Sequence, residues 1–181
     1  MQETADQYTQ RLLGYLDGRP GLRVQQATAK KLTLLTKRLD RKKLAQRPAP
    51  DKWSVAEILA HLADSELVIA WRLRLILTSN GAPIQAYDQD VWATTFNYRR
   101  RDPNESLARF RVLRESNVAL LKAAPKNLFE NYGMHAERGK ETISHLMNLV
   151  AGHDLNHLQQ VERIVKAPRT KRQQGKRRKR P

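Results

Sequence analysis

The helical spacing of apolar residues is the feature that most limits the fold of this 181-residue chain. After Ser54 these residues recur at steps of three and four, at Val55, Ile58, Leu59, Leu62, Ile69, Leu73 and Ile76. This period places them on one face of an α-helix. Ser54 and Glu57 have the spacing of a capping box at its start. The pattern therefore predicts a helix that begins after Ser54 and ends near Asn80.

Two more long helices have equally clear starts. Asp102 and Pro103 suit the cap and first position of a helix, which then continues to about Pro125. Thr142 opens another helix, which runs to about Lys166. Its apolar face comprises Ile143, Leu146, Met147, Val150, Val161 and Ile164. Both helices are long enough to cross a small domain.

The region before Trp53 gives weaker signals. Leu32, Leu35 and Leu39 predict a helix from about Thr28 to Leu44, and a shorter helix precedes it. Strand signals are nearly absent, so we expect an all-α four-helix bundle. Residues 1–27 would form an N-terminal helical extension and residues 28–166 the bundle. The stretch 82–101 would be a long crossover or loop.

Charge is distributed unevenly along the chain. The sequence has 34 Lys and Arg against 18 Asp and Glu, a net charge of +16. Nine of the basic residues and no acidic residue lie from Lys166 to the end, and we expect residues 167–181 to be a disordered basic tail. The span 19–52 holds eleven more basic residues and two acidic ones. This charge predicts weak, nonspecific binding to nucleic acid or another polyanion.

Several site chemistries and locations are excluded or disfavoured by the sequence. The chain has no cysteine, so disulfides, thiolate ligands and cysteine nucleophiles are absent, and a metal would need His, Asp or Glu. The N-terminus lacks the pattern of a signal peptide, and no run approaches the ~20 apolar residues of a membrane span. We therefore expect a cytoplasmic protein with no membrane partner.

Histidines interrupt the apolar face of the last helix. His153 and His157 are four residues apart, so their imidazoles lie on one side of the helix and could share a metal ion. His61, on the helix that begins after Ser54, could supply a third ligand from a second helix, as bundle metal sites do. The alternative is a network of hydrogen-bonded histidines in the core, since a buried polar group needs a partner.

Two segments carry a family resemblance. WSVAEILAHLADSE at 53–66 and AGHDLNHLQQVERI at 151–164 resemble the signature segments of the DinB/YfiT-like superfamily. The segments 87–92 and 135–139 are also similar to it, and the resemblance extends from about Thr28 to Val165. It implies a four-helix bundle that binds a divalent cation, usually nickel, zinc or a similar ion, through three histidines. By motif position these are His61, His153 and His157.

The resemblance also implies a reaction class. Relatives in this superfamily include transferases that use a low-molecular-weight thiol, such as bacillithiol, mycothiol or glutathione, beside members with no known reaction. Three histidines leave coordination positions open, and a cation there could activate water or ionise a substrate thiol. The absence of cysteine is compatible with a thiol that a cosubstrate supplies.

Other residues are candidates for the pocket around this site. Asp154 and Gln160 could orient an imidazole, although a solvent-facing aspartate and a glutamine at the edge of the core are alternatives. Arg114 and Asn117 fall on an otherwise apolar face and could form a polar wall or anion clamp; the alternative is a salt bridge between Arg114 and Glu66. His135 precedes the last helix, and we place it near the pocket mouth.

The sequence thus leaves several functions open. The leading hypothesis is a metal-dependent enzyme, either a thiol S-transferase or a hydrolase, that acts on a small molecule. The alternatives are a metal-binding bundle without catalysis and a basic protein that binds nucleic acid. A homodimer formed through an exposed apolar helix face is a further hypothesis.

Overall fold

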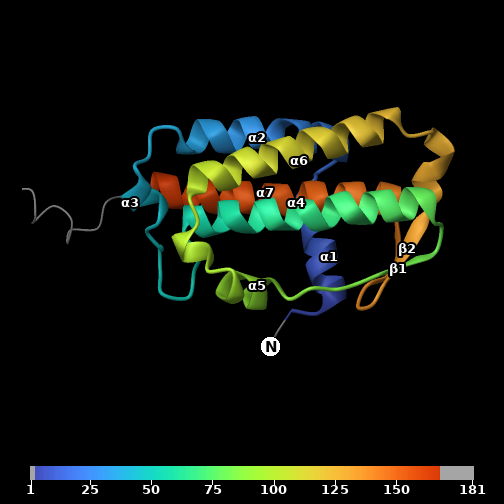
Figure 1. Ribbon diagram of the computed structural model, residues 1–181, viewed down its shortest axis with the longest axis horizontal. Coiled ribbons are helices and arrows are strands. Elements are labelled where there is room, and N and C mark those ends of the chain that lie inside the picture. The colour runs from blue at the N-terminus through green and yellow to red at the C-terminus, as the bar shows by residue number, and fades with distance from the viewer. Residues whose placement is uncertain (1–2, 168–181) are drawn as a thin grey trace, which may run out of the picture.

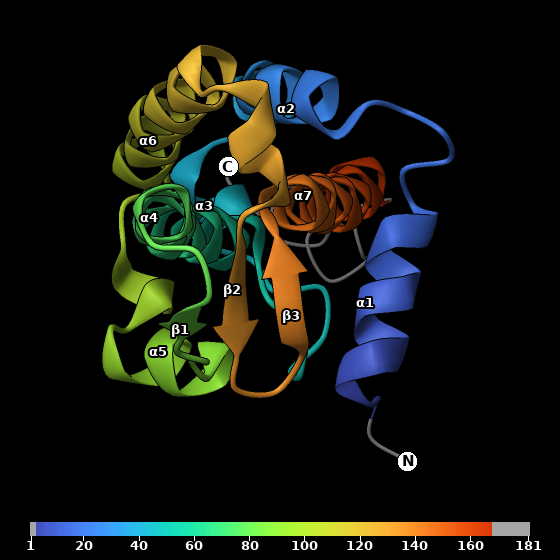
Figure 2. The same cartoon turned by 90° about the vertical axis from the view of Figure 1, so that its right-hand side faces the viewer.

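Four long helices pack lengthwise around a common core in the computed structural model, which describes residues 3–167 (Figure 1). Each helix contacts two others, in the cyclic order α2, α6, α4 and α7 (Figure 2). These helices are α2 (Gly21–Thr36), α4 (Val55–Thr78), α6 (Pro103–Ala123) and α7 (Ile143–Lys166). The predicted four-helix bundle is confirmed, and a short helix, α1 (Ala5–Gly14), precedes it.

Side-chain caps fix the starts of three bundle helices where the sequence predicts them. The Ser54 hydroxyl accepts a hydrogen bond from the Glu57 amide, and the Glu57 carboxylate accepts one from the Ser54 amide at 2.9 Å. Asp102 and Thr142 likewise accept bonds from amides of the first turns of α6 and α7. These bonds satisfy amide groups that lack a partner within the helix.

The first bundle helix differs from the prediction at both ends. It begins at Gly21 instead of Thr28, because Pro20 is its N-cap and Gly21 lies against α7. A Cβ atom at position 21 would lie 2.4 Å from the Asn148 side chain, so glycine permits this close contact. The helix then ends at Thr36, and a separate turn, α3 (Arg41–Leu44), starts at the side-chain cap of Asp40.

A small sheet for which the sequence carries no clear strand signal lies at one end of the bundle. Strand β1 (Ala82–Ile84) pairs in parallel with β2 (Tyr132–His135), which pairs in antiparallel fashion with β3 (Gly139–Thr142). The expected crossover of residues 82–101 therefore begins with a strand. It continues through α5 (Gln89–Thr95) and the 3₁₀ turn η1 (Tyr98–Arg100), and a second such turn, η2 (Lys126–Glu130), follows α6.

Buried polar side chains separate two apolar clusters within the bundle. One cluster packs Ile58 and Leu62 of α4 against Leu155 and Leu158 of α7. The other includes Leu73 and Ile76 of α4 and Leu146 and Val150 of α7. Between the two along these helices lie the buried side chains Ser65, Glu66, Arg72 and Asp154. Such groups need partners when they leave water, so this level is where a functional site is expected.

The N-terminal helix lies across the outer side of α7 (Figure 2). The contact is close at Gly152, where a Cβ atom would lie 2.1 Å from the backbone oxygen of Leu12. Leu12 is 1% exposed, so α1 is firmly packed there. None of the helices between residues 3 and 167 combines the length and apolar character needed to cross a membrane. The predicted disordered tail lies outside the described residues, apart from Ala167.

Candidate metal centre

Three histidines from two helices converge in the bundle. His61 comes from the second turn of α4, and His153 and His157 come from consecutive turns of α7. The Nε2 atom of His153 lies 3.0 Å from Nε2 of His61 and 3.1 Å from Nε2 of His157. His61 and His157 are buried and His153 is half-buried. We call these three residues the histidine cluster.

The surroundings keep these imidazoles neutral. Burial lowers the pKa of each histidine well below its usual value, and a neighbouring imidazole of the cluster adds to each shift. Nδ1 of His157 lies 3.1 Å from Oε1 of Gln160, an atom that only accepts, so Nδ1 carries the proton. The lone pair of His157 is therefore on Nε2, which faces the centre of the cluster, as a metal ligand requires.

The cluster fits a divalent transition-metal ion. Two nitrogen ligands at about 2.0–2.1 Å from a tetrahedral ion lie roughly 3.3–3.4 Å apart, close to the 3.0 and 3.1 Å found here. Among the described residues, the group that could hold an ion comprises these three histidines alone. Sites with three protein ligands keep a position open for water or substrate, whereas structural zinc sites usually have four.

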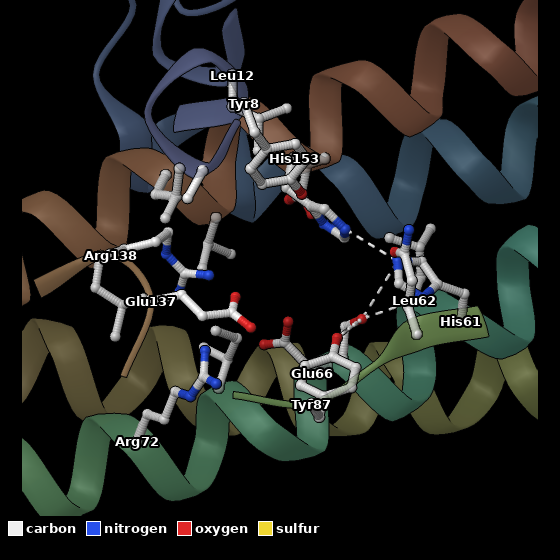
Figure 3. Close-up of a pocket in the computed structure, with 18 of the residues that line it drawn as sticks. Tyr8, Leu12, His61, Leu62, Glu66, Arg72, Tyr87, Glu137, Arg138 and His153 are labelled. Carbon is white, nitrogen blue, oxygen red and sulfur yellow. Dashed lines mark hydrogen bonds between the residues drawn. The ribbon is translucent and has the colours of Figure 1, made fainter. Parts of the chain in front are cut away.

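A cavity of about 430 Å³ opens beside the histidine cluster. Side chains of α1, α4, α6 and α7 line it, together with residues 87–90 and the loop at 137–138. His61 and His153 lie at one end, and Arg72 and Arg138 lie at the other (Figure 3). The site is therefore a pocket with two chemically different ends.

Three hydroxyl groups border the pocket near the histidines. The Ser65 hydroxyl lies 3.4 Å from Nε2 of His61 and 2.8 Å from the Tyr87 hydroxyl. Burial raises the pKa of Tyr87, and it raises the pKa of Tyr8 to about 12. Both phenols therefore keep their protons at neutral pH and can donate hydrogen bonds. Sequence reasoning missed the role of Tyr8, whose position depends on how α1 packs.

Arg114, Asn117 and Asp154 lie together in a separate group with Glu66. The Arg114 guanidinium donates to Glu66 at 2.9 and 2.7 Å and also to the Asp154 carboxylate. Asn117 donates to Glu66 at 2.8 Å, and the Thr28 hydroxyl donates to Asp154 at 2.8 Å. We call Arg114, Glu66 and Asp154 the arginine cluster.

This arrangement separates the candidates named from the sequence. The salt bridge between Arg114 and Glu66 is present, with both side chains buried, and both residues also form part of the pocket wall. Asp154 bonds to Arg114 and Thr28 instead of the imidazole that it was expected to orient, because its side chain leaves α7 in a different direction from His153. Gln160, in contrast, contacts His157 directly.

His135 lies apart from the histidine cluster, at the end of β2. It is 4% exposed, and its Nδ1 accepts hydrogen bonds from the amides of Glu137 and Arg138 at 3.2 and 3.4 Å. Burial, and after it the charge of Arg138, lowers its pKa. Its Nε2 atom lies 3.4 Å from the Arg72 guanidinium, so it belongs to the surroundings of the other end of the pocket.

Comparison with solved structures shows the same fold. The chain superposes on YfiT from Bacillus subtilis with a TM-score of 0.74 and 23% identity, over 86% of each chain. That protein is described as a probable metal-dependent hydrolase with an unusual four-helix bundle topology. At this identity the likeness concerns the fold.

Curated relatives are similar at the level of sequence. One from Oceanobacillus iheyensis, named a putative metal-dependent hydrolase, is 30% identical over 63% of this chain and 66% of its own length. The Bacillus subtilis relative of the same description is 28% identical over 62% and 64%. The chain thus spans slightly less than two thirds of these relatives. The model of the DinB superfamily matches residues 25–161, which include all three histidines, and the chain therefore belongs to the DinB superfamily.

Proposed function

We propose that this protein is a divalent-metal-dependent hydrolase that acts on a small molecule in the pocket beside the histidine cluster. The observation that carries the proposal is the convergence of three neutral imidazoles at one end of a cavity of about 430 Å³. A volume of this size is typical of small-molecule sites. The names of the relatives support hydrolysis as the reaction class.

The residues of the cluster divide the work of holding the ion. His61, His153 and His157 supply the ligands, and Gln160 fixes the orientation and the protonated nitrogen of His157. A divalent cation such as zinc or nickel would supply Lewis acidity and would lower the pKa of a water molecule that it binds. Half-buried His153 lines the cavity, so substrate reaches the cluster from this side.

The hydroxyl groups act as hydrogen-bond donors in this proposal. Tyr87 and Tyr8 stay protonated because burial raises the pKa of each phenol. A protonated phenol can stabilise negative charge that develops on a substrate oxygen. Ser65 holds the Tyr87 hydroxyl at 2.8 Å and so positions it beside His61.

Elemental analysis of the purified, untagged protein is the first test. We expect about one equivalent of a transition metal in the wild type and a loss of it in His153→Ala. His145→Ala is the matched control, because His145 lies on the same helix but outside the histidine cluster. A wild type that contains no metal and takes up none on reconstitution would overturn the proposal and leave a bundle whose histidines only pack.

Activity measurements separate hydrolysis from thiol transfer. Metal-loaded wild type and His145→Ala should hydrolyse members of a panel of small esters and amides without added thiol, and His153→Ala should not. Turnover that requires a low-molecular-weight thiol and an electrophile would replace the hydrolase proposal with the S-transferase that the sequence also suggested. Polyanion binding, pairing into a homodimer and a cytoplasmic location stay predictions.

A further inference from the structure

Arg72 occupies the end of the pocket that is remote from the histidine cluster (Figure 3). It follows His61 on α4 by about three helical turns, so the two side chains share one face of the helix, roughly 16 Å apart along its axis. Ser65, between them, lines the same cavity. One continuous wall of α4 therefore connects the candidate metal centre with a guanidinium group.

The guanidinium of Arg72 is buried without a carboxylate partner. The residue is 5% exposed, and its Nη2 atom donates to the backbone oxygen of Gln85 at 2.6 Å. None of the ion pairs found within residues 3–167 includes Arg72. A buried charge is normally paired, because leaving water without a counterion is costly. Most of its five N–H groups are thus available to a ligand.

Neighbouring groups increase the demand for an anion. His135 accepts two backbone bonds on Nδ1, so the neutral ring carries its proton on Nε2, which faces Arg72 at 3.4 Å as a second donor. Arg138, on the next loop, lines the same end of the cavity, and Glu141 neutralises it at 2.6 Å. Because this Nε2 cannot accept from Arg72, an oxyanion in the cavity would supply the acceptor that the guanidinium lacks.

Carboxylates elsewhere in the cavity wall are largely occupied. Glu66 bonds to Arg114 and Asn117, Glu3 pairs with Arg11, and Asp88 caps α5. Glu137 is exposed and extends into the cavity beside Arg72 and Arg138 (Figure 3). The negatively charged Glu137 carboxylate therefore competes with an anion for the positive charge of Arg72.

We propose that Arg72 binds an oxyanion, a carboxylate or phosphate group, and that the pocket selects elongated anionic molecules. The anionic group lies against the Arg72 guanidinium, and the reacting group lies at the histidine cluster. The second statement rests on the proposed hydrolase function. The statement that Arg72 binds an oxyanion does not depend on the metal.

Titration of the protein with sodium acetate and with inorganic phosphate, followed by NMR, tests the binding site. The Nε–Hε signal of Arg72 is identified by its absence from Arg72→Lys, and the amide signals of Glu137 and Arg138 give a second readout. We expect a saturable shift in the wild type with at least one of the two probes. We expect the apparent affinity to fall about tenfold or more in Arg72→Gln, as for the loss of a charge-assisted hydrogen bond.

Two controls separate the binding site from general charge and from folding. Arg111→Gln removes the same charge from an exposed position of α6 and should leave the affinity unchanged. Glu137→Gln removes the competing carboxylate and should tighten binding about threefold. If Arg72→Gln does not fold, the comparison of anion affinity between the wild type and Glu137→Gln still tests the proposal. Shifts that do not saturate, or an affinity that neither variant changes, would overturn the proposal.

The same titration in His153→Ala separates this inference from the proposed function. The variant should still bind the anion at Arg72, although it lacks the metal. If His153→Ala lacks metal and catalysis but still binds the anion, the metal site and the anion site are separate. If the wild type itself holds no metal, the hydrolase proposal fails and the anion-binding proposal does not. Loss of anion binding in His153→Ala would contradict an independent site at Arg72.

Discussion

The histidine cluster and the arginine cluster bury polar side chains within the same bundle, but they satisfy them in opposite ways. In the arginine cluster, the Arg114 guanidinium meets the carboxylates of Glu66 and Asp154, and Asn117 and Thr28 complete their hydrogen bonds. In the histidine cluster, three imidazoles present Nε2 atoms to one another. Two neutral imidazoles can share one hydrogen bond, in which one nitrogen donates and the other accepts. Three Nε2 atoms that face one another therefore include lone pairs that receive no hydrogen bond from within the cluster.

This difference indicates which cluster holds the fold together and which is available to a ligand. In the arginine cluster one guanidinium lies between two buried carboxylates, and removal of Arg114 leaves both of them without their cationic partner. The histidine cluster carries no charge while its pKa values are lowered by burial, and a cation is the partner that it lacks.

The largest effect is expected from Arg114→Ala. The substitution leaves Glu66 and Asp154 buried and unpaired, so the free energy of unfolding should fall by about 3–5 kcal/mol in denaturant titrations. Arg111→Ala, exposed on the same helix, is the control and should change it by less than about 0.5 kcal/mol. A small loss in Arg114→Ala would show that the arginine cluster does not stabilise the bundle.

Metal removal should destabilise the protein through the other cluster. With free metal at about a hundred times its dissociation constant, binding to the folded state adds about 2.7 kcal/mol to the free energy of unfolding. Zinc-loaded and EDTA-treated wild type should therefore differ by about this amount in thermal or denaturant unfolding. His153→Ala should unfold identically in both conditions. Equal stability of the two wild-type samples would count against metal binding by the folded protein.

The contact between Gln160 and His157 should tune metal affinity without affecting the fold. Gln160→Ala removes the acceptor at 3.1 Å from Nδ1, and loss of such a supporting group typically weakens metal binding 10- to 100-fold. Competition with a chelator of known affinity measures this change. Gln159→Ala, an exposed neighbour on α7, should bind metal as the wild type does. Equal affinities in the two variants would refute the orienting role.

A smaller effect concerns the pH dependence of stability at His135, outside both clusters. Burial lowers its pKa in the folded state below the ordinary value of 6.5. Above pH 6.5 the residue is neutral in both states and has no effect. Below it the unfolded chain takes up a proton that the folded protein does not, so stability falls as the pH falls towards the folded-state pKa.

The His135→Gln variant isolates this contribution. Between pH 7.5 and 5.5 the wild type should lose more of its free energy of unfolding than the variant, by at most about 1.4 kcal/mol for one group. Denaturant titrations at the two pH values measure the difference. The same pH dependence in both proteins would mean that His135 titrates alike in the folded and unfolded states.

Helix positions could be predicted from the sequence wherever a cap and a periodic stripe occur together. Ser54, Asp102 and Thr142 start helices at the expected residues because each satisfies amides through local bonds. The start of α2 at Gly21 could not be predicted, because the close packing of this glycine against Asn148 depends on a helix far away in the sequence. The strands were missed because segments of three or four residues carry little periodicity.

Helical geometry also explains the outcome for particular side chains. Trp71 is 66% exposed despite its size, since it lies two residues from Ile69 and from Leu73 and so on the opposite side of α4. The spacing of His153 and His157 showed that they share a face. It could not show which partners Asp154 or Arg72 would have, because these come from α6 and from the segment after β1.

Because α1 packs on the bundle at Gly152, the residues that can bind a metal and some of the residues that line the pocket lie on separate segments of the chain. The match to the DinB superfamily begins at residue 25, after α1, yet Tyr8 and Leu12 of this helix form one wall of the pocket. Exchange of α1 for another sequence with a small residue kept at position 152 would change the molecules that fit while every imidazole stays in place. Selectivity in this architecture can thus evolve, or be engineered, on a separate segment from reactivity.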